Sequence, residues 1–444
     1  MKLGSALLLA ALWAVPAPAQ EQQAPPEPER ESFRIGGEIK AGLRWSKNEQ
    51  STVFFPFPPN FLPANQSQVF MRTPEPGSSL EIQHLALVGE GEITSGVLAR
   101  FEVRALDLYN RNPTSSDDRI FVRQAYVRFG NKPEPLDAAP GGHFYAQFGM
   151  APRFTKQMVR HLESYGMWGT AVGRFEQPQL ELGARLGGKV YLRGALGSGN
   201  PLFFRDTNAL AGDNGTPERQ PGHVDPIYQS GFPILYDAKA SGVVGMSGRF
   251  EWGAGLGARF GGGEEAGADV LAWYFARRLS ERVRLAGTSY SGDLTLLRGN
   301  GVPLPFSGDR KKEWGVNVQA RAKGVRLFGQ YVDQDIARLR RRGVEVEAAW
   351  NVGLNGLFLV GESPFGNWIQ PVFRFSWIDN LFEVPREYPG LSVGWDWKKY
   401  DFGLRFGLVH GVDLTAEYTL HWVDRGPVPS IPMDELLVTL RVGF

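Results

Sequence analysis

A strict alternation of apolar and polar residues over long segments is the feature that most constrains this chain. In FRIGGEIKAGLRW, which begins at Phe33, Ile35 and Ile39 share one side of an extended chain, whereas Arg34 and Lys40 share the other. A period of two predicts β-strands with one apolar and one polar face. Because the same pattern recurs from Phe33 to the last residue, the predicted fold class is all-β.

The final segment, DELLVTLRVGF, raises the question of what covers its apolar face. Leu436, Val438 and Leu440 alternate with polar or small residues up to Phe444. A terminal strand of a soluble protein hides such a face against its own core. Lipid can cover it instead, and closure of the sheet into a barrel pairs both edges of the strand.

The connections between the alternating segments fall into two length classes. Some are minimal, at 187–188, 323–324 and 410–411, and others are long and polar, at 46–79, 151–178, 197–241 and 292–312. Short turns on one side and long loops on the other are typical of membrane barrels. A soluble β-sandwich would show the same alternation, but its strands are usually about half as long. A solenoid would show a fixed sequence repeat, which is absent here.

The fold prediction is therefore a transmembrane antiparallel up-and-down β-barrel over residues 33–444, with short periplasmic turns and long extracellular loops. The nineteen candidate strands, which include 242–250 and 283–291, make an odd number, and the weakest strand signals are at 142–149, 355–361 and 379–399. Since bacterial barrels have an even number of strands, 16–18 strands are expected.

The N-terminal residues predict export. Residues 1–19 carry Lys2, an apolar stretch and the small-residue end Ala17-Pro18-Ala19, which is the pattern of a cleaved signal peptide. Residues 20–32 are rich in Pro and Glu and predict a disordered linker. The chain has no cysteine, which excludes disulfides and thiolate metal sites. The net charge of +1 gives no indication of a nucleic-acid partner. The predicted location is the cell outer membrane.

Lumen charge is the second informative feature. If the polar side of each strand faces inward, basic residues lead acidic ones by roughly two to one, and a pore lined by one sign of charge favours the opposite ion. The predicted pore-lining residues are Arg34, Lys40, Arg44, Arg100, Arg104, Arg185, Arg193, Arg405 and Arg441, with Arg321, Arg326 and Arg374 on the same parity. The acidic residues facing them are Glu38, Glu102, Glu181, Glu345, Glu347, Asp401, Asp413 and Glu417. The alternative is that these charges neutralise each other in ladders across the strands.

The loop 151–178 is the candidate constriction. It carries Arg153, Lys156, Arg160 and Arg174. If the loop folds inward, these charges lie at the narrowest point of the pore, where they act most strongly. If it stays outside, they are ordinary solvated charges.

Other motifs carry no chemistry. GARLGGKV has Val190 where a phosphate-cradling loop needs Ser or Thr, and GAGLGA, at 253–258, lies inside strand sequence, where glycine relieves crowding. The histidines are scattered, although His84 and His421 fall on the polar side of their segments. No catalytic residue, metal site or cofactor is predicted. A barrel enzyme that hydrolyses lipid or peptide, and a non-conducting structural or adhesive barrel, remain alternatives.

Two stretches resemble a known family. FYAQFGMAPRFTKQMVRHLESYGMW, at 144–168, is similar to the third-loop region of the phosphate-selective porins of the O and P type, and the last three strands resemble that family's closing strands. The resemblance implies a trimeric 16-stranded barrel with its third loop folded inward. The family's lysine and arginine clusters have no residue-by-residue match here, so none is transferred.

These observations together predict an outer-membrane porin, a water-filled channel for passive diffusion of small hydrophilic solutes, with a preference for phosphate or other small anions. The expected partners are outer-membrane lipid and lipopolysaccharide, the barrel assembly machinery, for which Phe444 would be the signal, and two further copies in a homotrimer.

Overall fold

The computed structural model describes the greater part of the chain from Phe33 onward. The described residues are 33–47, 51–54, 68–71, 77–106, 120–130, 144–157, 159–164, 166, 176–186, 188–199, 234–237, 250–261, 266–279, 283–286, 299, 301, 303–354, 356–385, 394–425 and 428–444. The predicted signal peptide and linker, the candidate strand at 242–250 and Arg174 lie outside them.

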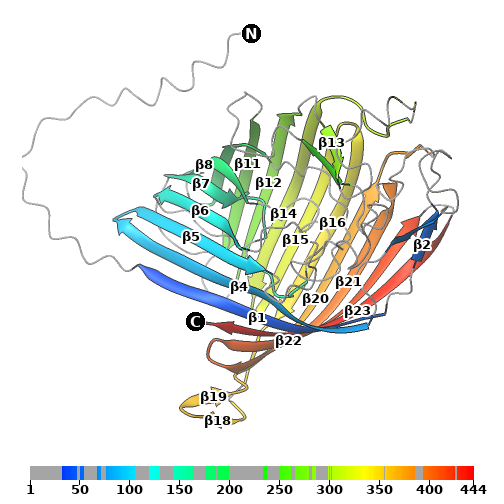
Figure 1. The fold of residues 1–444 in the computed structure, drawn as a ribbon. Helices are drawn as coiled ribbons and strands as arrows, with labels where there is room; N and C mark the ends of the chain where they lie inside the picture. Colours follow the sequence, from blue (N-terminus) through cyan, green and yellow to red (C-terminus); the bar gives the residue numbers. More distant parts are fainter. Residues whose placement is uncertain are drawn as a thin grey trace, which may run out of the picture.

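One antiparallel sheet runs through the described residues and closes into a barrel (Figure 1). Its first eight strands are β1 (Arg34–Lys47), β4 (Gly77–Thr94), β5 (Val97–Leu106), β6 (Ile120–Phe129), β7 (Phe144–Pro152), β8 (Glu176–Leu186), β9 (Val190–Gly197) and β11 (Glu251–Gly261). The others are β12 (Ala266–Arg278), β14 (Arg310–Ala322), β15 (Val325–Ile336), β16 (Leu339–Trp350) with its continuation β17 (Val352–Gly353), β20 (Trp368–Asn380), β21 (Asp396–Val409), β22 (Val412–Arg425) and β23 (Val428–Gly443). Since β16 and β17 both pair with β20, the seventeen segments form sixteen wall strands, within the predicted 16–18.

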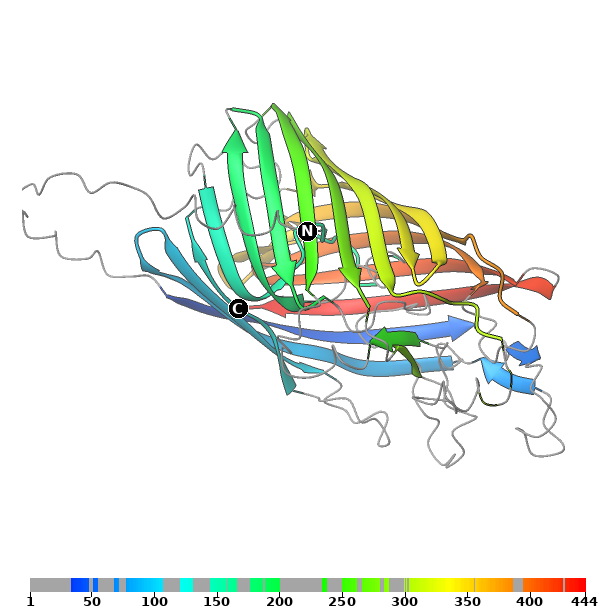
Figure 2. The same cartoon turned by 90° about the horizontal axis from the view of Figure 1, so that it is seen from above.

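The barrel closes where the first strand meets the last. β1 pairs with β4 on one edge and with β23 on the other, and the two ends of the sheet lie side by side in blue and red (Figures 1 and 2). The Gly37 amide donates to the Phe444 carbonyl at 2.8 Å, and the Phe444 amide donates back at 3.1 Å. This seam leaves no open sheet edge, as a strand structure inside hydrocarbon requires.

Three two-stranded ribbons are separate from the sheet that forms the wall. They are β2 (Ser51–Phe54) with β3 (Gln68–Met71), β10 (Ile234–Asp237) with β13 (Val283–Ala286), and β18 (Phe358–Val360) with β19 (Ser363–Phe365). Two strand predictions were therefore wrong. The segment 283–291 supplies β13, which pairs with β10, and 355–361 supplies β18, which pairs with the chain that directly follows it. Both have strand propensity, but sequence alternation does not reveal which partner a strand takes.

The distribution of side chains is the inverse of that in a soluble protein. Lys40 and Arg44 are only 7% and 5% exposed, whereas their neighbours Ile39 and Leu43 are 41% and 49% exposed. Large apolar side chains cover the exterior of the wall, and charged side chains lie inside it. No helix among the described residues is long and apolar enough to cross a membrane. The arrangement confirms the predicted fold class, a transmembrane β-barrel.

Exposed aromatic side chains mark both ends of the wall. At the end that carries both termini of the described chain, Phe33 and Phe444, they are Phe33, Phe129, Phe144, Phe260, Trp350 and Phe444. At the opposite end they are Trp45, Trp252, Trp314 and Trp422. Two aromatic girdles that bound an apolar band are characteristic of barrels that span a membrane.

Glycines inside the wall make room for large inward side chains. Gly253 pairs with Phe275 and Gly257 pairs with Tyr191, and a Cβ at either glycine would overlap the ring of its partner. The GAGLGA motif thus has the structural role that its sequence context indicates, because its glycines let inward aromatic rings lie flat against the curved wall.

Neighbouring positions on β14 offer a direct test of the membrane-facing assignment. Val318 points outward and is 41% exposed, and Gln319 points inward. We expect Val318→Arg to reduce the free energy of unfolding from lipid vesicles by about 2 kcal/mol, because it places a charge in hydrocarbon. Gln319→Arg should cost far less. Urea titration of the folded band on unheated gels measures both, and equal losses would contradict the assignment.

Candidate functional site

The segment from Arg153 to Gly166, which follows β7, lies across the interior of the barrel. Its residues contact inward side chains of at least ten wall strands, which are β1, β8, β11, β12, β14, β15, β16, β20, β21 and β22. We call its described residues, 153–157, 159–164 and 166, the inner loop. It follows β7 directly and precedes β8 in the chain.

The first anchor of the inner loop is Arg153. Its guanidinium donates to the Glu313 carboxylate, lies 3.6 Å from Glu251 and stands 3.6 Å from the centre of the Phe275 ring. Lys311 shares both carboxylates, at 2.6 Å from Glu251 and 3.4 Å from Glu313. Two buried cations and two buried carboxylates thus neutralise each other, as charges removed from water must.

The middle of the inner loop is held by polar side chains of the wall. The Thr155 carbonyl accepts hydrogen bonds from Asn317 at 2.7 Å and from Gln330 at 3.1 Å. Glu347 accepts from the Gln157 amide group at 3.0 Å and from the His161 backbone amide at 3.1 Å, and its carboxylate lies 2.8 Å from His161 Nδ1.

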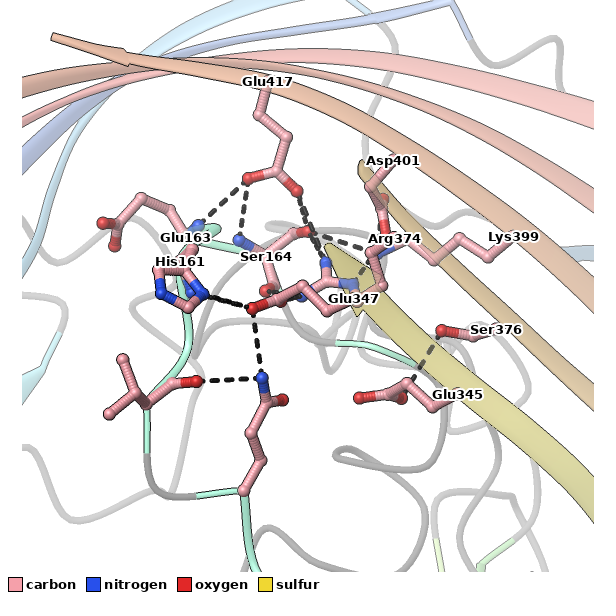
Figure 3. Close-up of polar contacts among 12 residues, drawn as sticks. His161, Glu163, Ser164, Glu345, Glu347, Arg374, Ser376, Lys399, Asp401 and Glu417 are labelled. Atoms are coloured by element: carbon pink, nitrogen blue, oxygen red, sulfur yellow. Dashed lines mark hydrogen bonds and ion pairs between the residues drawn. The ribbon is translucent and has the colours of Figure 1, made fainter. Parts of the chain in front are cut away.

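The end of the inner loop is fixed around Ser164 (Figure 3). The Ser164 hydroxyl donates to Glu417, whose carboxylate also accepts from the Glu163 and Ser164 amides at 3.0 and 3.1 Å. Arg374 donates to the Ser164 carbonyl at 3.0 Å and to its hydroxyl at 2.5 Å. Lys399 donates to the same hydroxyl at 3.3 Å. These contacts from three strands leave Ser164 1% exposed.

Two glycines allow this close approach. A Cβ at Gly166 would overlap the Glu345 carboxylate, and a Cβ at Gly403 would overlap the Leu162 side chain. Leu162 packs with Ala349 and Val372 in a small apolar cluster between the inner loop and the wall.

An ion pair with β1 completes the attachment. Lys40 Nζ lies 2.7 Å from the Glu163 carboxylate, and both side chains are buried. Burial by itself raises the pKa of Glu163, but the positive charges of Lys40 and Arg160 outweigh it and hold the pKa below its ordinary value. Glu163 therefore remains charged in its buried position.

The predicted pore-lining residues divide into three groups. Lys40, Arg44, Arg193 and Arg405 are buried inside, Arg100, Arg104 and Arg441 are partly buried there, and Arg34 and Arg185 lie close to the end that carries the termini. Most of them have acidic neighbours: Arg44 lies 2.9 Å from Glu435, Arg104 2.6 Å from Glu102, and Arg441 2.5 Å from Asp413. Of the constriction residues, Arg153, Lys156 and Arg160 lie in the inner loop.

The predicted two-to-one excess of basic residues does not hold for the buried interior. Among the described residues, twelve buried Lys and Arg face thirteen buried Asp and Glu. The alternation of strands identified the inward arginines, but it missed carboxylates such as Glu251, Glu313 and Glu435, which lie at strand ends or outside the segments counted. Here the alternative, neutralising ion pairs, is the better description.

The basic excess is instead concentrated in one cavity beside the inner loop. This chamber of about 580 Å³ lies between the loop and the barrel end that carries the termini. Its cationic lining residues are Arg100, Arg128, Arg153, Lys156, Arg193, Arg321 and Arg326, and its acidic ones are Glu90 and Glu347. Seven cations outnumber two carboxylates in this lining, although Arg100, Arg153 and Lys156 each pair with a carboxylate, Glu90, Glu313 and Glu176 respectively. No group of His, Cys, Asp or Glu among the described residues could hold a metal ion.

Comparison with known proteins identifies the fold. No protein-family model and no curated protein matches the sequence. Among solved structures, the chain is similar to the outer membrane channel DcaP of Acinetobacter baumannii, with a TM-score of 0.50 and 10% identity over 93% of this chain and 97% of that one. It is also similar to OprB of Pseudomonas putida, with a TM-score of 0.51 and 8% identity over 93% and 94%. The chain has the fold of outer-membrane porins.

Removal of Glu417 should release the end of the inner loop. Each charge-assisted hydrogen bond lost in Glu417→Ala is worth about 1.5–3 kcal/mol, so we expect a looser loop with larger and noisier single-channel conductance. Asp413→Asn is the matched control, because Asp413 lies on the same strand but pairs with Arg405 and Arg441. Equal current noise in the two variants would argue against the anchoring role.

The Lys40–Glu163 pair predicts a pH dependence. Because the pKa of Glu163 is lowered in the folded state, the contact is complete above its ordinary value of 4.5 and is lost only as pH falls through the lower value. Lys40→Met removes the positive charge that most lowers the pKa of Glu163. Burial should then raise this pKa, so Glu163 should become protonated and the inner loop should loosen at a higher pH. Single-channel noise recorded from pH 7 downward tests this, and an unchanged onset would disprove it.

Proposed function

We propose that this protein is an outer-membrane porin that lets small hydrophilic solutes diffuse through a water-filled lumen, with a preference for anions. The observation that carries the proposal is the positive chamber beside the inner loop, with seven cations and two carboxylates in its lining. The porin fold, the apolar exterior and the charged interior support it.

Electrostatics explains why one chamber matters more than the balanced interior. Buried ion pairs such as those of Arg153 and Arg374 cancel locally and present little field to a passing solute. Of the chamber cations, Arg128 and Arg326 have no carboxylate within ion-pair distance among the described residues. Uncompensated charge beside a narrowing lowers the energy of an ion of opposite sign there and raises it for the same sign.

The location and partners follow from the same features. The apolar band between two aromatic girdles fits contact with outer-membrane lipid, and the exposed end of the wall opposite the termini would face lipopolysaccharide. Phe444, paired with Gly37 at the seam, is our candidate signal for the barrel assembly machinery. Export by residues 1–19 and assembly as a homotrimer remain predictions.

The contacts around Ser164 favour a channel over a hydrolase. Ser164 donates to Glu417 and accepts from Arg374 and Lys399, while His161 is engaged by Glu347. A nucleophilic serine needs a base that takes its proton and a free face toward substrate. Here the hydroxyl is 1% exposed and enclosed by charged partners, which suits an anchor of the inner loop.

Single-channel recording across a salt gradient tests the proposal. Wild-type protein is expected to give a reversal potential of anion-selective sign. Arg321→Gln combined with Arg326→Gln should move that potential clearly toward zero, because both side chains line the chamber. The matched control is Arg340→Gln, an exposed arginine bound to Asp333.

The outcomes separate the parts of the proposal. Absence of conductance would overturn the porin function, whereas a cation-selective reversal potential would overturn only the anion preference. If Arg340→Gln shifted selectivity as much as the double variant, the chamber would not be the selective element.

A further inference from the structure

We propose that the chamber beside the inner loop is a binding subsite for small aromatic carboxylates, and that it selects them over inorganic anions of the same charge. This inference rests on the proposed channel function and names the class of solute. It is carried by a feature that charge alone does not explain, namely the apolar groups that lie among the arginines.

The charged half of the subsite comes from two pairs of neighbouring strands. Arg321 and Arg326 are directly opposite each other across β14 and β15, and Arg100 and Arg128 lie on β5 and β6. Arg128 Nε is buried with no hydrogen-bond partner among the described residues. A carboxylate, which accepts two parallel hydrogen bonds from a guanidinium, fits this demand.

The apolar half comes from the inner loop and β15. Val159 is 49% exposed although it lies on a loop inside a charged lumen, and it lines the chamber together with Phe154 and Phe328. An adjoining cavity of about 240 Å³ shares Val159, His161 and Arg326 with the chamber. There the Arg405 guanidinium stands 5.4 Å from the centre of the Trp368 ring. Cationic and apolar groups are therefore mixed in the linings of both cavities.

This mixture favours an anion with a flat apolar body. Phosphate or chloride would satisfy the arginines but leave Val159 in contact with water. A benzoate-like solute would place its carboxylate on the arginines and its ring against Val159, and an aromatic ring also stacks on a guanidinium plane. The chamber volume of about 580 Å³ lies within the range of small-molecule sites and accepts such a ring with room for water.

The experiment compares four probes on the purified full-length protein: benzoate, acetate, inorganic phosphate and benzylammonium. Calorimetry in detergent gives the binding constants, and planar bilayers give the reduction of single-channel chloride current. We expect benzoate to bind and to block at concentrations about tenfold lower than acetate or phosphate, because ring burial adds more than one tenfold step in affinity. Benzylammonium, which has the ring without the negative charge, should do neither.

Two variants separate the halves of the subsite. Val159→Ser should weaken benzoate binding about fivefold and leave the effects of acetate and phosphate unchanged. Arg326→Gln should weaken all three anions. Val346→Ser, an exposed valine on the outer face of β16, is the matched control and should change nothing.

Each result is decisive for a different claim. If benzoate bound no better than acetate in a channel that is anion-selective, the subsite would be disproved and the porin function retained. An unaltered benzoate affinity in Val159→Ser would equally overturn it. A protein without conductance that still binds benzoate in calorimetry would support the subsite and refute the channel.

Discussion

Closure of the sheet is the constraint on which the rest of the structure depends. Inside hydrocarbon, every backbone amide and carbonyl must find a partner within the protein, and a sheet achieves this only when its first and last strands pair. β1 and β23 meet along ten residue pairs, with Gly37 and Phe444 bonded reciprocally at the end. Once the ring is closed, each strand has one face toward lipid and one toward the lumen.

That division sends the charged residues inward, where they must neutralise each other. The interior accordingly contains clusters of alternating sign, such as Arg153 and Lys311 with Glu251 and Glu313. Removing one member of such a cluster would leave a buried charge without its counterion, which typically costs about 3–5 kcal/mol. The same property makes the clusters suitable anchors, and they tie the inner loop to the wall from β8 round to β1.

Asymmetric anchoring of the inner loop creates the chamber. The charged side chains of the loop form ion pairs with the wall: Arg153 with Glu313, Lys156 with Glu176 and Glu163 with Lys40. The arginines nearer the end that carries the termini keep fewer acidic neighbours. The proposed anion selectivity would then depend on the lumen charges that the loop leaves without a counterion, more than on the total charge of the lumen.

The sequence by itself determined the fold class, the inward face of each strand and the tight turn at Lys323–Gly324, because a period of two and turn chemistry are local properties. It also placed Lys40, Arg44, Arg193 and Arg405 inside. Only the tertiary structure decided that 283–286 and 358–360 pair outside the wall, that Glu251 and Glu313 balance Arg153, and that Val159 lies among arginines of other strands. The physical reason is that alternation fixes the direction of a side chain but not the strand or side chain that it meets. A partner such as Glu313, which is 160 residues from Arg153 along the chain, is fixed only when the barrel closes around the loop.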